Sequence, residues 1–165
     1  MRLQRLFFRQ RLPATLEECW AFFSDPAKLR DITPAFLDFR VTSPLPPRMH
    51  AGMIVSYRIR PVAGLRLNWV TEITQVREPF FFVDEQRFGP YRFWHHQHHF
   101  RPVAGGVEMD DEVHYSLPLE LPGALLDRFL VAPKLERIFA YRRAVLEERF
   151  GPFVAPADPA ITRPT

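Results

Sequence analysis

Cysteine is almost absent from this 165-residue sequence, with Cys19 as the single example. One thiol excludes an internal disulfide and is typical of a reducing compartment. No stretch approaches the roughly 18 consecutive apolar residues of a membrane-spanning helix. The apolar residues near the N-terminus are interrupted by charges, which argues against a signal peptide. These absences predict a cytoplasmic protein without stable membrane insertion.

A strong charge of one sign is also missing. Lys and Arg together number 22 and Asp and Glu 19, for a formal net charge of +3. The small basic excess is scattered along the chain rather than gathered in a run. Nucleic-acid binding normally requires a clustered basic surface, so we expect no nucleic-acid partner.

Motifs of the common enzyme classes are absent as well. The sequence contains no Gly-x-Ser-x-Gly elbow, no phosphate-binding loop and no dinucleotide fingerprint. We therefore expect no cofactor. The absence of these motifs favours a protein that is not an enzyme, without excluding one.

Aromatic residues are abundant by comparison. They make up 14% of the chain, and 16 of them are Phe. So many large rings need either a bulky core or a cavity to line. The length suits one domain, which we place at 1–150, followed by a loosely ordered, proline-rich tail at 151–165.

The hydrophobic periodicity predicts an α+β protein. A two-residue period indicates strands of an antiparallel sheet wet on one side, and steps of three and four indicate helices. We expect a first strand and two short helices, then six strands, and finally a long helix that Pro133 kinks or splits. The predicted ranges are 3–12, 16–23 and about 26–32; 37–43, 53–59, 65–74, 80–88, 91–102 and 107–117; and 122–149.

A repeated turn sets two strand registers. Arg-Pro-Val-Ala-Gly occurs at 60–64 and again at 101–105, where Gly106 adds one residue. If each proline ends a paired strand, Tyr57 lies opposite Trp69 in the first hairpin. In the second hairpin His98 lies opposite Asp111. Because the inner face of the last strand is unambiguous, its partner must turn the even-numbered residues of 94–100 inward.

His96, His98 and Asp111 are therefore the candidate polar site on an otherwise apolar face. Three interpretations remain open for them: a buried pair that fixes the register, an anchor for a ligand headgroup, or an acid–base or metal site. No additional ligand is evident nearby, so we expect no metal. The sequence does not determine which face of the sheet Asp84 and Gln86 occupy, because the Gly-Pro turn after their strand is compatible with either register. The favoured interpretation is that they lie on a solvated edge.

One stretch resembles the SRPBCC superfamily of helix-grip proteins, which includes START domains and polyketide cyclases. It reads Phe82-x-Asp84-x-Gln86-x-x-Gly89-Pro90-Tyr91-x-x-Trp94-x-His96-x-His98-x-Phe100. Later positions also fit, among them Asp111, Tyr115 and Arg142, and the resemblance covers about residues 2–150. It implies a curved antiparallel sheet of about seven strands wrapped around a long C-terminal helix, with a hydrophobic ligand cavity between them.

The predicted function is binding of a small hydrophobic molecule, such as a lipid, isoprenoid or polyketide, by a carrier or sensor. The alternative is a cyclase or dehydratase that uses the histidines and Asp111 as an acid–base pair. A protein-interaction module that displays the outer sheet is a third, weaker hypothesis. The residues expected to line the cavity are Tyr57, Leu67, Trp69, Trp94, His96, His98, Phe100, Met109, Asp111, Val113, Tyr115 and Phe139.

Overall fold

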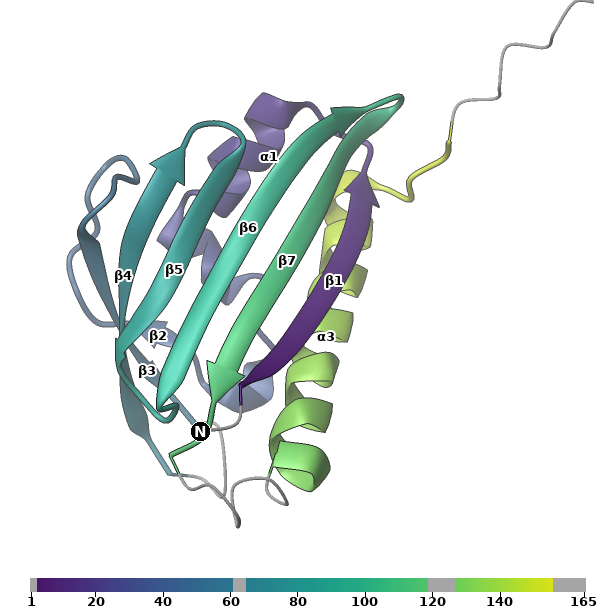
Figure 1. Ribbon diagram of the computed structural model, residues 1–165. Helices are drawn as coiled ribbons and strands as arrows, with labels where there is room; N and C mark the ends of the chain where they lie inside the picture. The colour runs from purple at the N-terminus through teal and green to yellow at the C-terminus, as the bar shows by residue number, and fades with distance from the viewer. Residues whose placement is uncertain (1–2, 61–64, 119–126, 156–165) are drawn as a thin grey trace, which may run out of the picture.

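The structure is a computed structural model that describes residues 3–60, 65–118 and 127–155. Its strands form one antiparallel sheet in the order β1-β7-β6-β5-β4-β3-β2. Figure 1 shows this sheet strongly curved, with helices α1 (Leu16–Phe23) and α3 (Ala132–Phe150) on the same face. The strands are β1 (Gln4–Leu12), β2 (Arg40–Val41), β3 (Met53–Ile59), β4 (Leu67–Arg77), β5 (Phe81–Phe88), β6 (Phe93–Val103) and β7 (Gly106–Ser116). The chain thus has the α+β helix-grip fold, as predicted.

Both registers inferred from the repeated turn are confirmed. Tyr57 pairs with Trp69 between β3 and β4, and His98 pairs with Asp111 between β6 and β7. The extra Gly106 is required at its position, because a Cβ atom there would lie 2.0 Å from the carbonyl oxygen of Leu12. Residues 61–64 of the first turn lie outside the described residues.

The segment after β1 differs in part from the prediction. A capping box between Thr15 and Glu18 starts α1 at the expected residue. The second short helix is a 3-10 helix, η1 (Pro26–Arg30). The strand predicted at 37–43 shrinks to β2, because another 3-10 helix, η2 (Ala35–Leu37), precedes it and Asp38 takes a positive φ of 42°. Such a conformation interrupts an extended strand.

The long C-terminal helix begins differently from the prediction. A π-helical turn, η3 (Asp127–Val131), leads directly into α3. Pro133 lies in the first turn of α3, where its missing N–H would have no helical partner, so it starts this helix instead of bending it. The predicted start at 122 lies outside the described residues.

The buried core fills the space between α1 and the sheet. The ring of Trp20 meets Phe82 and Phe100 edge-on, with centroids 5.9 and 6.2 Å away. Cys19 is fully buried there, and burial raises the pKa of its thiol to about 12. Of the predicted tail, 151–155 form neither helix nor strand and 156–165 lie outside the described residues. Among the helices described, none is both long and apolar enough to cross a membrane.

Candidate functional site

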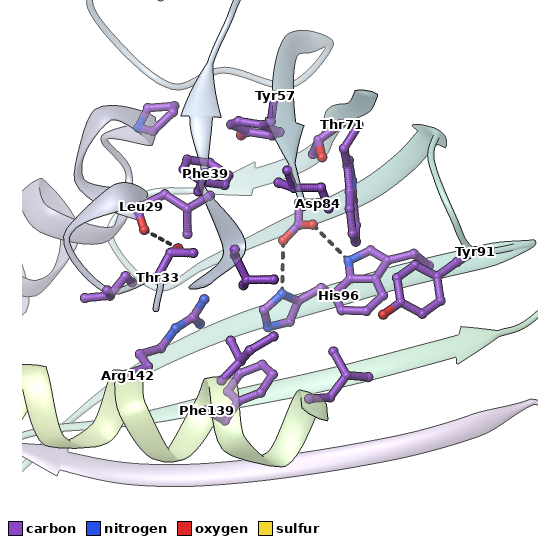
Figure 2. A pocket seen from close by; sticks show the side chains of 18 of the residues that line it. Leu29, Thr33, Phe39, Tyr57, Thr71, Asp84, Tyr91, His96, Phe139 and Arg142 are labelled. Atoms are coloured by element: carbon purple, nitrogen blue, oxygen red, sulfur yellow. Dashed lines mark hydrogen bonds and ion pairs between the residues drawn. The ribbon is translucent and has the colours of Figure 1, made fainter. Parts of the chain in front are cut away.

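A cavity of about 510 Å3 opens between the concave face of the sheet and helix α3. Its walls come from β3 to β6, from α3 and from the 3-10 segment after α1. Figure 2 shows Tyr57 and Thr71 on the sheet side, Phe139 on the helix side, and Leu29 and Thr33 closing a third side. Most of the lining side chains are apolar, and several are aromatic.

The cavity matches part of the predicted lining. Seven of the twelve predicted residues line it: Tyr57, Leu67, Trp69, Trp94, His96, His98 and Phe139. The other five are buried but not among its lining residues: Phe100, Met109, Asp111, Val113 and Tyr115. Their placement on the cavity wall was wrong because α1 and α3 cover that part of the sheet. Phe100 packs against Trp20, and Tyr115 belongs to the same buried cluster as Phe139.

Sequence reasoning missed the wall formed by the segment after α1. Leu29, Ile32, Thr33 and Leu37 line the cavity from this side. They belong to short 3-10 helices and turns, where neither a two-residue nor a helical period holds. No periodic signal could have assigned them to the cavity.

Three neighbouring strands bring two aspartates and two histidines together beside the cavity. Asp84 on β5 pairs with His96 on β6, and His98 pairs with Asp111 on β7. Side chains two residues apart on a strand share a face, so all four point to the concave side. The two imidazole rings lie 3.8 Å apart between their centroids.

Each histidine is hydrogen-bonded to the aspartate diagonal to it. His96 Nε2 lies 2.9 Å from Asp111 Oδ1, and His98 Nε2 lies 2.9 Å from Asp84 Oδ2. The Nδ1 atoms face the directly opposite aspartates, at 3.2 Å from Asp84 and 2.9 Å from Asp111. The second of these contacts is short but poorly aligned, and His98 Nδ1 makes no hydrogen bond within the part of the chain that the structure describes. His98 and Asp111 thus lie together as predicted, whereas the aligned bond to Asp111 comes from His96.

The position of Asp84 differs from the one predicted from the sequence. The favoured solvated edge is wrong, since Asp84 lines the cavity and accepts a hydrogen bond of 3.2 Å from Trp94 Nε1. Figure 2 shows its carboxylate directed at His96. Gln86 has a different role: its side-chain amide bonds both the N–H and the carbonyl of Tyr91, which closes the turn after β5.

Arg142 completes the cluster from helix α3. Its guanidinium lies above the ring of Phe139, 4.9 Å from the ring centroid, and Nη1 donates to Asp111 Oδ1 at 3.4 Å. The residue is 8% exposed and lines the cavity. The sequence identified Arg142 only as part of a resemblance, because the rotation of a helix over a sheet does not follow from its own periodicity.

The charges of the cluster offset one another. Burial alone would raise the pKa of Asp84 and of Asp111, but nearby positive charge outweighs it. The charge of His96 and the hydrogen bonds from both histidines hold the pKa of Asp84 below its usual value. Arg142 and the histidines do the same for the pKa of Asp111. Burial opposes the charged form of His96, yet Asp84 and Asp111 raise the pKa of this imidazole.

These shifts predict how stability depends on pH. The raised pKa of His96 adds stability that is fully present below its unfolded value of about 6.5 and is lost as the pH rises through the folded value. The lowered pKa values of the aspartates add stability above about pH 3.9 that is lost in more acid solution. We therefore expect the free energy of unfolding, measured with urea, to decline from pH 6 towards pH 9. His96→Gln should flatten this decline, and an unchanged slope in the variant would contradict the assignment.

Asp84, His96 and His98 are also the described residues best placed to hold a metal. Each offers a ligand atom, and these atoms all lie within 4.8 Å of one another. The sequence argument that no additional ligand is nearby therefore does not hold. However, Asp84 already lies 2.9 Å from a nitrogen of His98 and 3.2 Å from a nitrogen of His96. Distances this short are those of hydrogen bonds between the carboxylate and the two rings. This geometry favours hydrogen bonds, and the absence of a metal stays our expectation.

Comparisons with known proteins agree on the fold. No family model matches the sequence, and no curated protein matches it. Among solved structures, a Thermus thermophilus protein is similar with a TM-score of 0.68 and 20% identity, over 89% of this chain and 97% of that one. A Chromobacterium violaceum protein also gives 0.68, with 13% identity over 90% and 98%. The ginseng major latex-like protein 151 from Panax ginseng gives 0.64, with 12% identity over 91% and 99%.

Proposed function

We propose that this protein binds a small hydrophobic molecule without reacting with it, as a carrier or sensor of the SRPBCC type in the cytoplasm. The cavity between sheet and helix carries this proposal. Its volume of about 510 Å3 falls within the range of small-molecule pockets. A lipid, an isoprenoid or a polyketide has the apolar surface that these walls would cover.

The contrast with an ordinary protein interior supports binding. Interiors are close-packed and contain few voids larger than a water molecule. The side chains that face an empty apolar space of this size lack dispersion contacts on that side, and a hydrophobic ligand would supply them. Tyr57, Leu67, Trp69, Trp94 and Phe139 form the apolar surface in this proposal.

The histidine–aspartate cluster supplies polar groups to the same site. Buried charged groups in a cavity wall orient a ligand, because only one end of an amphipathic molecule can satisfy them. His96 and His98 contact the ligand in this proposal. Asp84 and Asp111 hold the two rings in place.

An acid–base reaction of the cyclase or dehydratase type is the second candidate. One observation favours it: His96 lines the cavity, and two carboxylates raise the pKa of its imidazole, which suits a general acid. Against it, both nitrogens of His96 already face carboxylates, so proton transfer to a ligand would need the ring to turn. Binding without reaction is therefore our first proposal.

Native mass spectrometry of the purified protein tests the proposal. We expect a population heavier than the bare chain by the mass of one small molecule, which organic solvent releases. Stripped protein should then take up N-phenyl-1-naphthylamine, an uncharged dye that fluoresces in apolar surroundings, with one site per chain. Bare protein that also fails to bind the dye would refute binding. Chemical conversion of the released compound by wild-type protein, but not by His96→Gln, would favour the second candidate.

A further inference from the structure

Arg142 has hydrogen-bonding capacity that its surroundings do not use. A guanidinium offers five N–H donors, and within the described part of the chain its side chain makes one hydrogen bond, the long contact of 3.4 Å to Asp111. Its Nε atom is buried and has no hydrogen-bond partner among the described residues. The large majority of buried side-chain polar atoms in proteins do have partners. A buried cation with idle donors beside a cavity indicates that a partner is missing.

The protein holds this guanidinium at the cavity. Figure 2 shows Arg142 extending from α3 into the space bounded by Thr33 and Phe139. Phe139 lies three residues earlier, one helical turn away, and its ring supports the guanidinium at 4.9 Å. Asp111 fixes the other side. An arginine restrained in this way loses little side-chain entropy when it binds a ligand.

The charge of the cluster determines which partner suits Arg142. Asp84 and Asp111 already place two carboxylates in this cluster, and Arg142 donates to one of them, Asp111. A ligand carboxylate would add a third negative charge close to two buried carboxylates, at the cost of burying an unpaired charge. An uncharged oxygen, as in a ketone, accepts hydrogen bonds without changing this balance.

We propose that Arg142 binds an uncharged oxygen acceptor, a ketone or a similar carbonyl, on the hydrophobic ligand. This subsite rests on the proposed function, since it needs a ligand in the cavity. The apolar walls hold the body of the molecule, and a small turn of the guanidinium aims Nε or an Nη atom at the oxygen. The preferred ligand is therefore neutral and carries a carbonyl at one end, in contrast to a fatty acid or a plain hydrocarbon.

Three matched compounds test the subsite by displacement of N-phenyl-1-naphthylamine: tetralin, α-tetralone, and the corresponding tetralin-1-carboxylic acid. They share one bicyclic frame and differ in the polar group. For wild-type protein we expect α-tetralone to bind about tenfold more tightly than tetralin, the factor of a single good hydrogen bond to a charged donor. The acid should bind more weakly than the ketone at pH 7.

Arg142→Met keeps the length of the side chain and removes its donors. The advantage of the ketone over tetralin, taken as the ratio of their affinities for the same variant, should fall below about twofold. Arg142→Lys, which retains the charge, should keep part of the advantage and serves if the methionine variant does not fold. Arg143→Met is the matched control, because Arg143 donates to the backbone of Arg9 instead.

The outcomes distinguish failure of the subsite from failure of the proposed function. A ketone advantage that survives Arg142→Met, equal binding of ketone and hydrocarbon, or strongest binding of the acid would each overturn the subsite. All three leave the cavity function intact, because the dye and tetralin still bind. Failure of the dye itself to bind removes the proposed function and the subsite together.

Discussion

Asp111→Ala should lower the free energy of unfolding by about 3–5 kcal/mol, the usual cost of removing one partner from a buried ionic cluster. Asp111 is 5% exposed and lies within 2.9 Å of nitrogens on both His96 and His98. Arg142 also donates to it. Without Asp111 the buried guanidinium would lose the hydrogen bond that it makes within the described residues. Urea unfolding at pH 7, followed by tryptophan fluorescence, measures the change.

The neighbouring Asp110 offers a matched control. It lies on the same strand and is 4% exposed, but its partners Arg9 and Arg101 are half-exposed on the outer face of the sheet. Solvent can take over the interactions of those arginines. Asp110→Ala should therefore cost only about 1 kcal/mol, in the upper range for ion pairs near the surface. Equal losses in the two variants would show that the inner cluster has no special importance for stability.

A double-mutant cycle extends this comparison. If the interaction of Asp111 with His96 is as direct as the 2.9 Å contact indicates, the loss in the variant that lacks both side chains should be less than the sum of the single losses. The same cycle between Asp110 and His96 should give additive losses, because the two side chains lie on opposite faces of the sheet.

Much of the fold follows from the sequence because strand residues alternate between the two faces of the sheet and the length of a turn sets the register of a hairpin. The alternation of inner and outer residues holds along β6 and β7, and one extra glycine at 106 defines their register. Those two features place His96, His98 and Asp111 together. Regular one-to-one pairing fails between β4 and β5, where the register shifts between Ile73 and Gln75 and again between Val70 and Thr71. A count of residues across such bulges cannot assign the facing of Asp84.

The register of the sheet could be predicted from the sequence, but the set of residues that line the cavity could not. Which inner residues face empty space depends on where the helices lie, and helix position results from packing throughout the molecule. Phe100 and Trp94 are indistinguishable by alternation on β6, yet Phe100 is 1% exposed beneath α1 whereas Trp94 lines the cavity. For the same reason Arg142, an arginine in the middle of an amphipathic helix, gives no sequence signal of its burial.

Filling the cavity should weaken ligand binding without harming the fold. Thr71 lines the cavity from the middle of β4, is 4% exposed, and carries one of the smallest side chains there. Thr71→Trp would place a bulky ring in the space where a ligand would lie. We expect the affinity for N-phenyl-1-naphthylamine to fall at least about tenfold, since overlap with the new ring excludes the bound pose.

The stability of the same variant separates occupation of the cavity from damage to the core. A tryptophan that enters empty apolar space gains contacts, and cavity-filling changes commonly add about 0.5–2 kcal/mol. In a core that is already packed, the same substitution would cost about 1–3 kcal/mol. The melting temperature of ligand-free Thr71→Trp should therefore stay level or rise. Ile54→Trp on the outer face of β3, where Ile54 is 48% exposed, should change neither binding nor melting. Thr71→Trp that binds the dye as wild type does would place the dye site outside this cavity.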